Sequence, residues 1–301
     1  MQNIFIIALS FITGVLLRYV DLRGINIAKI LNTLIIYLSL PSLILLKIPT
    51  VKISNDTDIV LVLPWVLTII SAIFILLLSK RYKLKREEIG SLLLVGVLGN
   101  TSFLGVPLID LFFGKDYVSY ALLYDQLGSF IILSTYGSVI VSIFSKHITF
   151  SIKSVLKRIL TFPPFITLVL SLLIRGVKYD DTILFWLETL SSTLVPFALL
   201  SVGYQLRLKV PKNERAALFI AIFTKTVFAP LVALFICLIF TDMSMVAKVA
   251  ILEAGMGPMI TASIMANLAG LAPRVTNAIV GYGILVSFIT LPIFYYISSY
   301  F

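Results

Sequence analysis

Three charged side chains lie well inside long apolar segments of the sequence. They are Asp125, Lys225 and Glu253. A charge at membrane depth is costly, and residues of this kind mark ion or substrate pathways by default. The two carboxylates could hold a proton or a sodium ion, because hard cations prefer oxygen ligands. The alternative is that Lys225 forms a fixed ion pair with one acid and takes the place of a transported cation.

Glycine, proline and polar side chains interrupt two of these apolar segments. Residues 99–109 read GNTSFLGVPLI, and residues 253–258 read EAGMGP. Proline lacks an N–H and disfavours helix at the preceding residue, so each cluster predicts a broken helix, the first at Val106 and Pro107. A break at membrane depth survives only where it faces protein or a water-filled cavity.

The half-helix after each break presents unpaired N–H groups and a positive dipole end. Two such ends that converge on one cavity favour an anion, most simply a carboxylate. Close helix packing is the alternative explanation for the glycines, but two clusters at matching positions favour a binding site. The residues expected to contact the anion are Asn100, Thr101, Ser102, Gly105, Pro107, Met256, Gly257 and Pro258. Free carbonyls beside Asn100, Thr101 or Glu253 could serve a cation.

Apolar residues dominate the composition of the chain. Hydrophobic residues make up 59% of the 301 positions and charged residues 13%, with a mean hydropathy of +1.08, which is typical of a protein embedded in a bilayer. A single cysteine, Cys237, excludes a disulfide framework and a cysteine metal site. Nucleophile-elbow, H-E-x-x-H and phosphate-loop motifs are absent from the sequence, so we expect neither an enzyme nor an ATP-driven pump.

Ten apolar windows are long enough to cross a membrane, which takes about 20 residues. They fall at about 3–20, 28–48, 58–79, 89–113, 117–145, 155–176, 182–206, 214–240, 243–270 and 274–298. We therefore predict an all-α membrane protein with ten transmembrane helices. The first window lacks a basic leader and is read as a true span, not as a signal peptide.

Lysine and arginine concentrate in alternate loops. The loops after the first, third, fifth, seventh and ninth windows hold most of the 24 basic residues. By the positive-inside rule these loops are cytoplasmic, and both termini lie on the non-cytoplasmic side of the cell membrane. This distribution explains the net charge of +10, so we expect no nucleic-acid partner. We expect membrane lipid to surround the protein.

The two halves of the chain look like repeats of each other. A shift of 155 residues places Pro41 on Pro196 and sets the NTS of the first interruption over the GMG of the second. We predict repeats at residues 1–150 and 151–301. Each has five spans, an odd number, so the second is inverted in the membrane. Many secondary carriers are built in this way, with the substrate near the midplane between the repeats.

With these residues in view, the sequence resembles the auxin efflux carrier family over essentially its whole length. The motif at 99–109 is the most specific element, supported by Leu40-Pro41-Ser42 and by Tyr124-Asp125. The resemblance implies that spans four and nine break and cross at the substrate site, with Asn100 as a substrate ligand. It also implies a dimeric scaffold of spans one, two, six and seven, and an elevator-like transport domain of spans three to five and eight to ten. Microbial relatives are associated with dicarboxylates such as malate or malonate, and plant relatives with auxin.

The second interruption departs from the plant pattern, which counts against auxin itself. Glu253-Ala254-Gly255-Met256 is instead similar to a motif of the bile acid sodium symporters, although Gly257 stands where that motif has glutamine. That likeness implies a sodium site at Glu253, Asn100, Thr101 and Met256.

The expected function is therefore secondary transport of a small organic anion by alternating access. Coupling to protons or sodium would run through Glu253 and Asp125. The first alternative is an uncoupled uniporter or channel with Lys225 as a fixed counter-charge. The second alternative is a membrane receptor that binds the ligand without moving it.

Overall fold

The computed structural model describes residues 2–20, 26–53, 56–145, 148–176, 179–208 and 214–301. Throughout these ranges the chain is helical, apart from loops and one isolated β-bridge. Within them, six helices are long and apolar enough to cross a membrane, and a seventh is added if a pair bent by 61° counts as one span. The predicted all-α class is thus confirmed, while ten spans in two inverted repeats stay a prediction.

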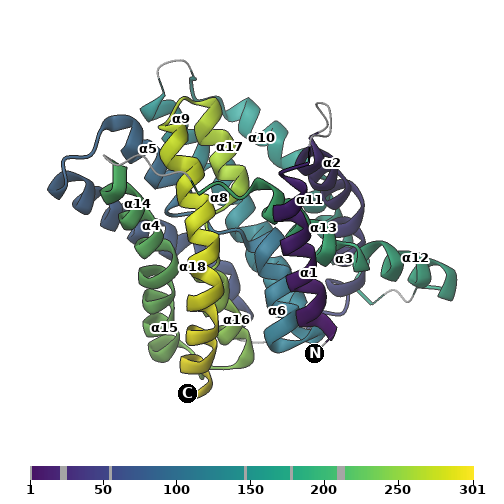
Figure 1. The fold of residues 1–301 in the computed structure, drawn as a ribbon. Coiled ribbons are helices and arrows are strands. Elements are labelled where there is room, and N and C mark those ends of the chain that lie inside the picture. Colours follow the sequence, from purple (N-terminus) through teal and green to yellow (C-terminus); the bar gives the residue numbers. More distant parts are fainter. Residues whose placement is uncertain (1, 21–25, 54–55, 146–147, 177–178, 209–213) are drawn as a thin grey trace.

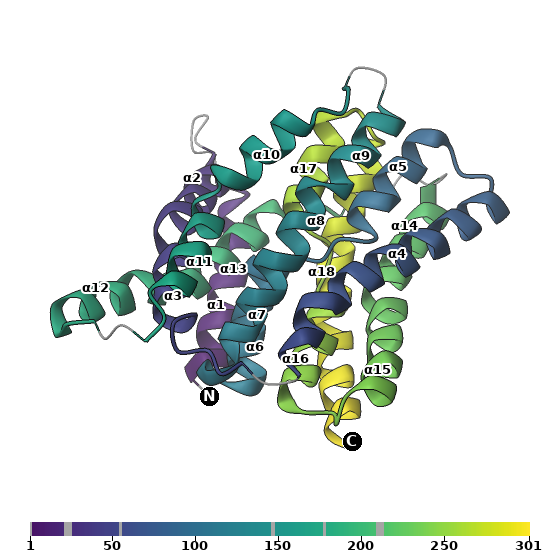
Figure 2. The ribbon, with the colours of Figure 1, turned by 180° about the vertical axis from the view of Figure 1, so that it is seen from behind.

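One group of helices gathers around the N-terminal helix (Figures 1 and 2). Its members are α1 (Gln2–Leu17), α2 (Ile27–Leu34), α3 (Leu40–Lys47), α10 (Ile152–Leu160), α11 (Pro163–Leu173), α12 (Asp181–Ser192) and α13 (Leu194–Gln205). α1 packs along α13, and α3 packs on α11 and α12. Gly14 of α1 faces the Leu200 carbonyl and Gly203 of α13 faces the Phe11 carbonyl, with no room for a Cβ atom at either glycine. Small residues therefore let these two helices touch backbone to backbone.

A second group contains the remaining helices. They are α4 (Thr57–Arg81), α5 (Arg86–Val95), α6 (Val106–Phe113), α7 (Val118–Leu123), α8 (Phe130–Ser134), α9 (Tyr136–Phe144), α14 (Arg215–Phe223), α15 (Ala229–Phe240), α16 (Met245–Ala254), α17 (Ile260–Leu268) and α18 (Pro273–Ser299). α18 contacts α5, α14, α16 and α17, and it runs through the middle of this group in Figure 1. The two groups meet where α6 touches α1 and α13, and where α7 touches α3. A static scaffold and a moving domain stay a prediction, as do the repeat boundaries.

Four wide helical turns interrupt the helices in the part of the chain that the structure describes. They are η1 (Ile35–Ser39), η2 (Thr101–Gly105), η4 (Tyr124–Ser129) and η6 (Thr224–Phe228), each a π-helical turn with i to i+5 hydrogen bonds. Three of them end two residues before a proline, namely Pro41, Pro107 and Pro230. A proline ring clashes with the carbonyl four residues earlier, and the wider turn redirects that part of the hydrogen-bond ladder.

The predicted position of the first break was wrong by several residues. Val106 is helical, with φ −52° and ψ −49°, and Pro107 lies in the first turn of α6. η2 and α6 form one continuous helix, Thr101–Phe113, and the proline is tolerated because the wider turn of η2 ends just before it, with the Val106 amide bonded to the Thr101 carbonyl. The chain leaves the helix earlier, at residues 96–100, and re-enters it through η2.

Candidate substrate and ion site

The two breaks in the chain lie against each other and are joined by backbone hydrogen bonds. Gly99 and Pro258 form an isolated antiparallel bridge. On either side of it, the Asn100 amide donates to the Gly257 carbonyl at 2.7 Å, and the Met259 amide donates to the Leu98 carbonyl at 2.9 Å. Proline fits in this bridge because the Gly99–Pro258 pair exchanges no hydrogen bond of its own. Segments more than 150 residues apart in sequence thus satisfy each other's backbone at the point where both helices are interrupted.

Asn100 closes the first break with its side chain. Its Oδ1 accepts the Phe103 amide at 3.3 Å and caps the turn η2. Its Nδ2 is buried and has no hydrogen-bond partner among the described residues. A buried amide donor without a partner is unfavourable, so this atom is available to a ligand oxygen.

Asp125 is held by three donors. Thr101 Oγ1 lies 2.5 Å from its Oδ1, while Ser102 Oγ and Gln126 Nε2 each lie 2.6 Å from its Oδ2. η4 carries the acid, and η2 carries both hydroxyls. A buried carboxylate is stable when its lone pairs are satisfied in this way. Asp125 therefore connects the polar start of the half-helix, Thr101 and Ser102, to the fifth predicted span through these hydrogen bonds.

Glu253 differs from Asp125 in its hydrogen bonding. It is fully buried near the end of α16, and neither carboxylate oxygen has a hydrogen-bond partner in the described part of the chain. The carboxyl group lies against Gly105 of η2, where a Cβ atom would come within 2.7 Å of Oε1. Any residue other than glycine at position 105 would bring a Cβ atom too close to this carboxyl group.

Lys225 lies close to the crossing point but does not bond to either acid. Its Nζ donates to the carbonyl of Ala254 at 2.7 Å, and it is 5% exposed. A Cβ atom at Gly99 would lie 2.9 Å from the same Nζ. The ammonium group thus satisfies one of the free carbonyls at the C-terminal end of α16.

Several of these groups line a small cavity of about 20 Å³. Thr101, Lys225 and Glu253 line it together with Gly99. The volume is enough for one water molecule or one small cation. Oxygen atoms of Glu253 and Thr101 fit a sodium ion in kind, whereas the ammonium of Lys225 lining the same space does not favour a second positive charge.

Eight of the predicted site residues fall into three sets. Thr101, Glu253 and Lys225 share the small cavity; Asn100, Gly257 and Pro258 make the crossing; Ser102 and Asp125 are bonded to each other. Gly105 lies against Glu253, and Met256 is fully buried within the second break. Pro107 is buried in α6 and does not line the small cavity.

The sequence interpretation gave no role to Thr68, Ser71 and Ser129, which also line the small cavity. The available signal was the spacing of Thr68 and Ser71, which places two hydroxyls on one face of an otherwise apolar helix.

Comparison with known proteins identifies the family of the chain. The sequence profile of a family described as membrane transport protein matches residues 4–295. The chain belongs to this family, the auxin efflux carriers. An uncharacterized transporter of Methanocaldococcus jannaschii is 34% identical over 223 residues, which are 70% of each chain. An uncharacterized transporter of Methanothermobacter thermautotrophicus is 23% identical over 299 residues, 97% of this chain and 96% of the relative. The protein is a multi-pass membrane transporter and not an enzyme, as the sequence predicted.

Proposed function

We propose that this transporter is a secondary carrier of small organic anions, most simply dicarboxylates such as malate or malonate. The observation that carries the proposal is the crossing of the two broken helices beside the unpartnered Nδ2 of Asn100. η2 begins directly after one break and α17 directly after the other. Each start offers N–H groups and a positive dipole end, which suit a carboxylate.

We further propose that the carrier works as an elevator. The helices around α1 and α13 would form the scaffold, and the group around α18 would carry the substrate across the membrane. Support comes from the contact of η2 with α13, which places the polar start of the half-helix at the boundary between the groups. In this scheme the scaffold also forms a homodimer. α12 supports that part, because none of its residues is buried and it carries exposed aromatic side chains, Phe185 and Trp186.

We place both termini on the non-cytoplasmic side of the cell membrane. In support, α1 begins and α18 ends at the same end of the molecule (Figure 1), as an even number of crossings requires. Fusions of a fluorescent protein to either terminus would stay dark in a bacterial periplasm reached through the general secretory route. Fluorescence from both fusions would reverse the assignment.

In the coupled form of the proposal, Glu253 binds the coupling proton or sodium ion, and Asp125 holds the hydroxyl-bearing turn beside it. The two free oxygens of Glu253 and the adjoining small cavity support this role. Thr101 supplies a further oxygen at the same cavity.

A second candidate, an uncoupled uniporter, is favoured by the position of Lys225. Its ammonium group lines the same cavity as Glu253 and is fixed by the Ala254 carbonyl. A permanent positive charge at this place would balance the acid without any transported cation.

Uptake into proteoliposomes tests the proposal. Labelled malate and malonate are offered while a sodium gradient or a proton gradient is imposed separately, with protein-free liposomes as the control. Accumulation above equilibrium under one gradient identifies the coupled carrier and its ion. Equilibration at the same final level under every gradient identifies the uniporter. No saturable uptake of any carboxylate in either liposome orientation would contradict the anion-carrier proposal itself.

A further inference from the structure

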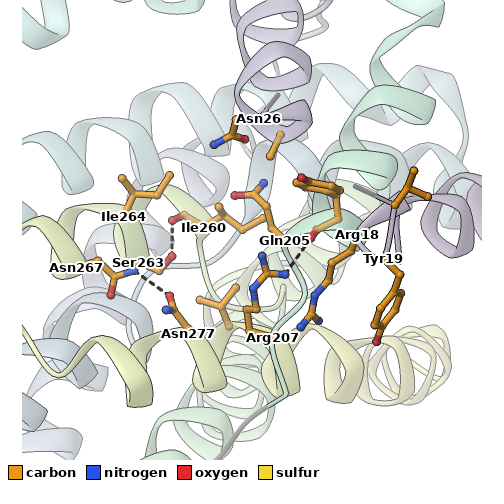
Figure 3. Close-up of a pocket in the computed structure, with 14 residues that line it drawn as sticks. Arg18, Tyr19, Asn26, Gln205, Arg207, Ile260, Ser263, Ile264, Asn267 and Asn277 are labelled. Carbon is orange, nitrogen blue, oxygen red and sulfur yellow. Dashed lines mark hydrogen bonds between the residues drawn. The ribbon is translucent and has the colours of Figure 1, made fainter. Parts of the chain in front are cut away.

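A cavity of about 790 Å³ opens between the two helix groups, far larger than the space at the crossing point (Figure 3). One wall comes from the end of α13 and from the segments that follow α1 and α13, including Gln205, Arg18 and Arg207. The opposite wall comes from α17 and α18, including Ser263 and Asn277. Because Arg18 follows the last residue of α1, the cavity lies at the end of that helix remote from the N-terminus. This is the lysine- and arginine-rich side.

Arg18 and Arg207 lie side by side in this cavity and donate to one backbone carbonyl. Arg18 Nη1 donates to the Leu206 carbonyl at 2.5 Å, and Arg207 Nη1 donates to the same carbonyl at 3.2 Å. None of the described residues that line the cavity is an aspartate or glutamate. Each guanidinium has five N–H donors. Arg207 Nη1 also donates to the Tyr204 carbonyl at 3.2 Å, and the contacts with the described residues leave donors of both groups for a ligand.

Two positive charges that share one acceptor repel each other. Burial, and then the neighbouring charge of Arg18, lower the pKa of Arg207 from its ordinary value. Arginine nevertheless stays charged in proteins. An anion placed between the two guanidinium groups would relieve this repulsion, and a carboxylate matches their forked geometry.

The rest of the lining suits a small organic acid. Asn267 donates to Asn277 at 2.8 Å, so two neutral amides lie together on the wall opposite the arginines. Ile260, Ile264 and Val280 supply apolar surface for a short hydrocarbon part. The cavity therefore offers positive charge, neutral polar groups and apolar contact in one place.

The cavity also leads to the crossing point. Ile260 lines it and is the first residue of α17, directly after the Met259 amide that bonds across the two breaks. The cavity that holds the arginines thus borders the first residue of the half-helix on which the proposed substrate site is built.

We propose that this cavity is a vestibule in which Arg18 and Arg207 capture a soluble carboxylate anion before it reaches the crossing point. The inference rests on the proposed function for the identity of the anion, and on the structure for the site. Capture by fixed charges raises the local anion concentration and the rate of association, and salt weakens it.

A thiol probe measures the electrostatics independently of transport. Cys237 is buried, so Ile264→Cys in a Cys237→Ala background presents one accessible thiol in the vestibule. We expect an anionic methanethiosulfonate to react faster there than a cationic one, on the order of tenfold relative to a free thiol. Arg18→Gln and Arg207→Gln should each reduce this preference, and Arg207→Lys should keep most of it. Arg81→Gln, which removes an exposed charge outside the cavity, is the matched control and should leave the ratio unchanged.

Malate protection tests capture itself. In phosphatidylcholine liposomes, malate should slow modification of the introduced thiol, and the slowing should disappear in the double variant Arg18→Gln/Arg207→Gln. Variants are compared only as monodisperse protein, with Arg207→Lys as the folded reference. The proposal is overturned if malate, malonate and acetate all fail to protect, or if protection survives loss of both arginines. It is also overturned if phosphatidylglycerol in the bilayer protects and the soluble acids do not, since a lipid headgroup would then hold the site.

The two proposals can fail separately. Protection by malate without malate uptake would keep the vestibule and refute transport of that acid. Saturable malate uptake that is the same in wild type and the double arginine variant, without protection, would keep the carrier and refute the vestibule.

Discussion

The ammonium group of Lys225 is bonded to the backbone carbonyl of Ala254 at 2.7 Å, and not to the carboxylate of the adjacent Glu253. The lysine therefore serves the backbone of the broken helix directly, by satisfying a carbonyl that has lost its helical partner. Its charge acts on the acid across the small cavity that both residues line. This arrangement separates the structural role of Lys225 from its electrostatic one, so different substitutions should affect each role.

Substitution of Lys225 should distinguish its hydrogen bond from its charge. Lys225→Gln keeps a donor for the Ala254 carbonyl, whereas Lys225→Met leaves that buried carbonyl unpaired. We expect the methionine variant to be less stable than the glutamine variant by about 1 to 3 kcal/mol, the cost of an unsatisfied buried polar group. Thermal unfolding in detergent measures the difference, with the exposed Lys115→Met as control. Equal unfolding temperatures for the two variants would show that the bond to Ala254 contributes nothing.

Asp125→Asn should destabilise the junction between η2 and η4. The carboxylate accepts from Thr101, Ser102 and Gln126, and an amide side chain replaces one accepting oxygen by a donor. Charge-assisted bonds of this kind contribute about 1.5 to 3 kcal/mol. A double-mutant cycle of Asp125→Ala with Thr101→Val should show strong non-additivity, because each of these two changes removes the bond between the side chains. Additive effects would contradict the network, and the exposed Asp116→Asn should have little effect.

The elements of the fold were predictable where the signal is local. Long apolar windows specify membrane helices because the bilayer core demands them, and every predicted window contains helix in the structure. The π-helical turns were not foreseen, since they depend on how each proline is accommodated within its own helix. Val106 shows this, because it stays helical before Pro107 as the residue that closes the π-helical turn η2, with its amide bonded to the Thr101 carbonyl.

The site was predictable in its residues but not in its pairings. Glycine, proline and buried charge single out Asn100, Asp125 and Glu253 from the sequence alone. Which of the two acids finds hydrogen-bond donors depends on the angles between the spans. No local sequence pattern encodes these angles. Asp125 accepts from two hydroxyls of η2, while the Glu253 oxygens lie against Gly105 and have no hydrogen-bond partner among the described residues.

Gly105→Ala should displace the carboxylate of Glu253. The new Cβ atom would lie 2.7 Å from Oε1 and 2.9 Å from Cδ of that residue, which real atoms do not tolerate. We expect transport to be lost and the unfolding temperature to fall. Glu253→Ala in the same chain should restore stability, because it removes the clashing atoms. Gly137→Ala is the control, since its Cβ would meet nothing closer than 3.4 Å. Failure of the second substitution to restore stability would contradict the contact.

Glu253→Gln should raise stability in the absence of a coupling ion. A buried carboxylate without hydrogen bonds costs more than a neutral amide of the same shape, and both oxygens of Glu253 are unpartnered in the described structure. Under the coupled proposal, sodium or acid pH should stabilise the wild type by binding its folded state, and should not stabilise the variant. Unfolding temperatures with sodium or choline chloride, at several pH values, measure this effect. An ion-dependent shift of the same size in both proteins would exclude Glu253 as the coupling site, and the exposed Glu87→Gln should behave as wild type.

Two substitutions of Asn100 should distinguish the capping role of its Oδ1 atom from the proposed ligand-binding role of its Nδ2 atom. Serine caps a helical turn about as well as asparagine, whereas alanine cannot and costs about 0.5 to 2 kcal/mol. Asn100→Ser should therefore keep the unfolding temperature of wild type, and Asn100→Ala should lower it. Both variants lose the Nδ2 donor that has no protein partner among the described residues, so both should raise the half-saturating concentration of malate in liposome uptake. A serine variant with unchanged half-saturation would mean that the amide only closes the break, and that the anion is held by the backbone of the two half-helices.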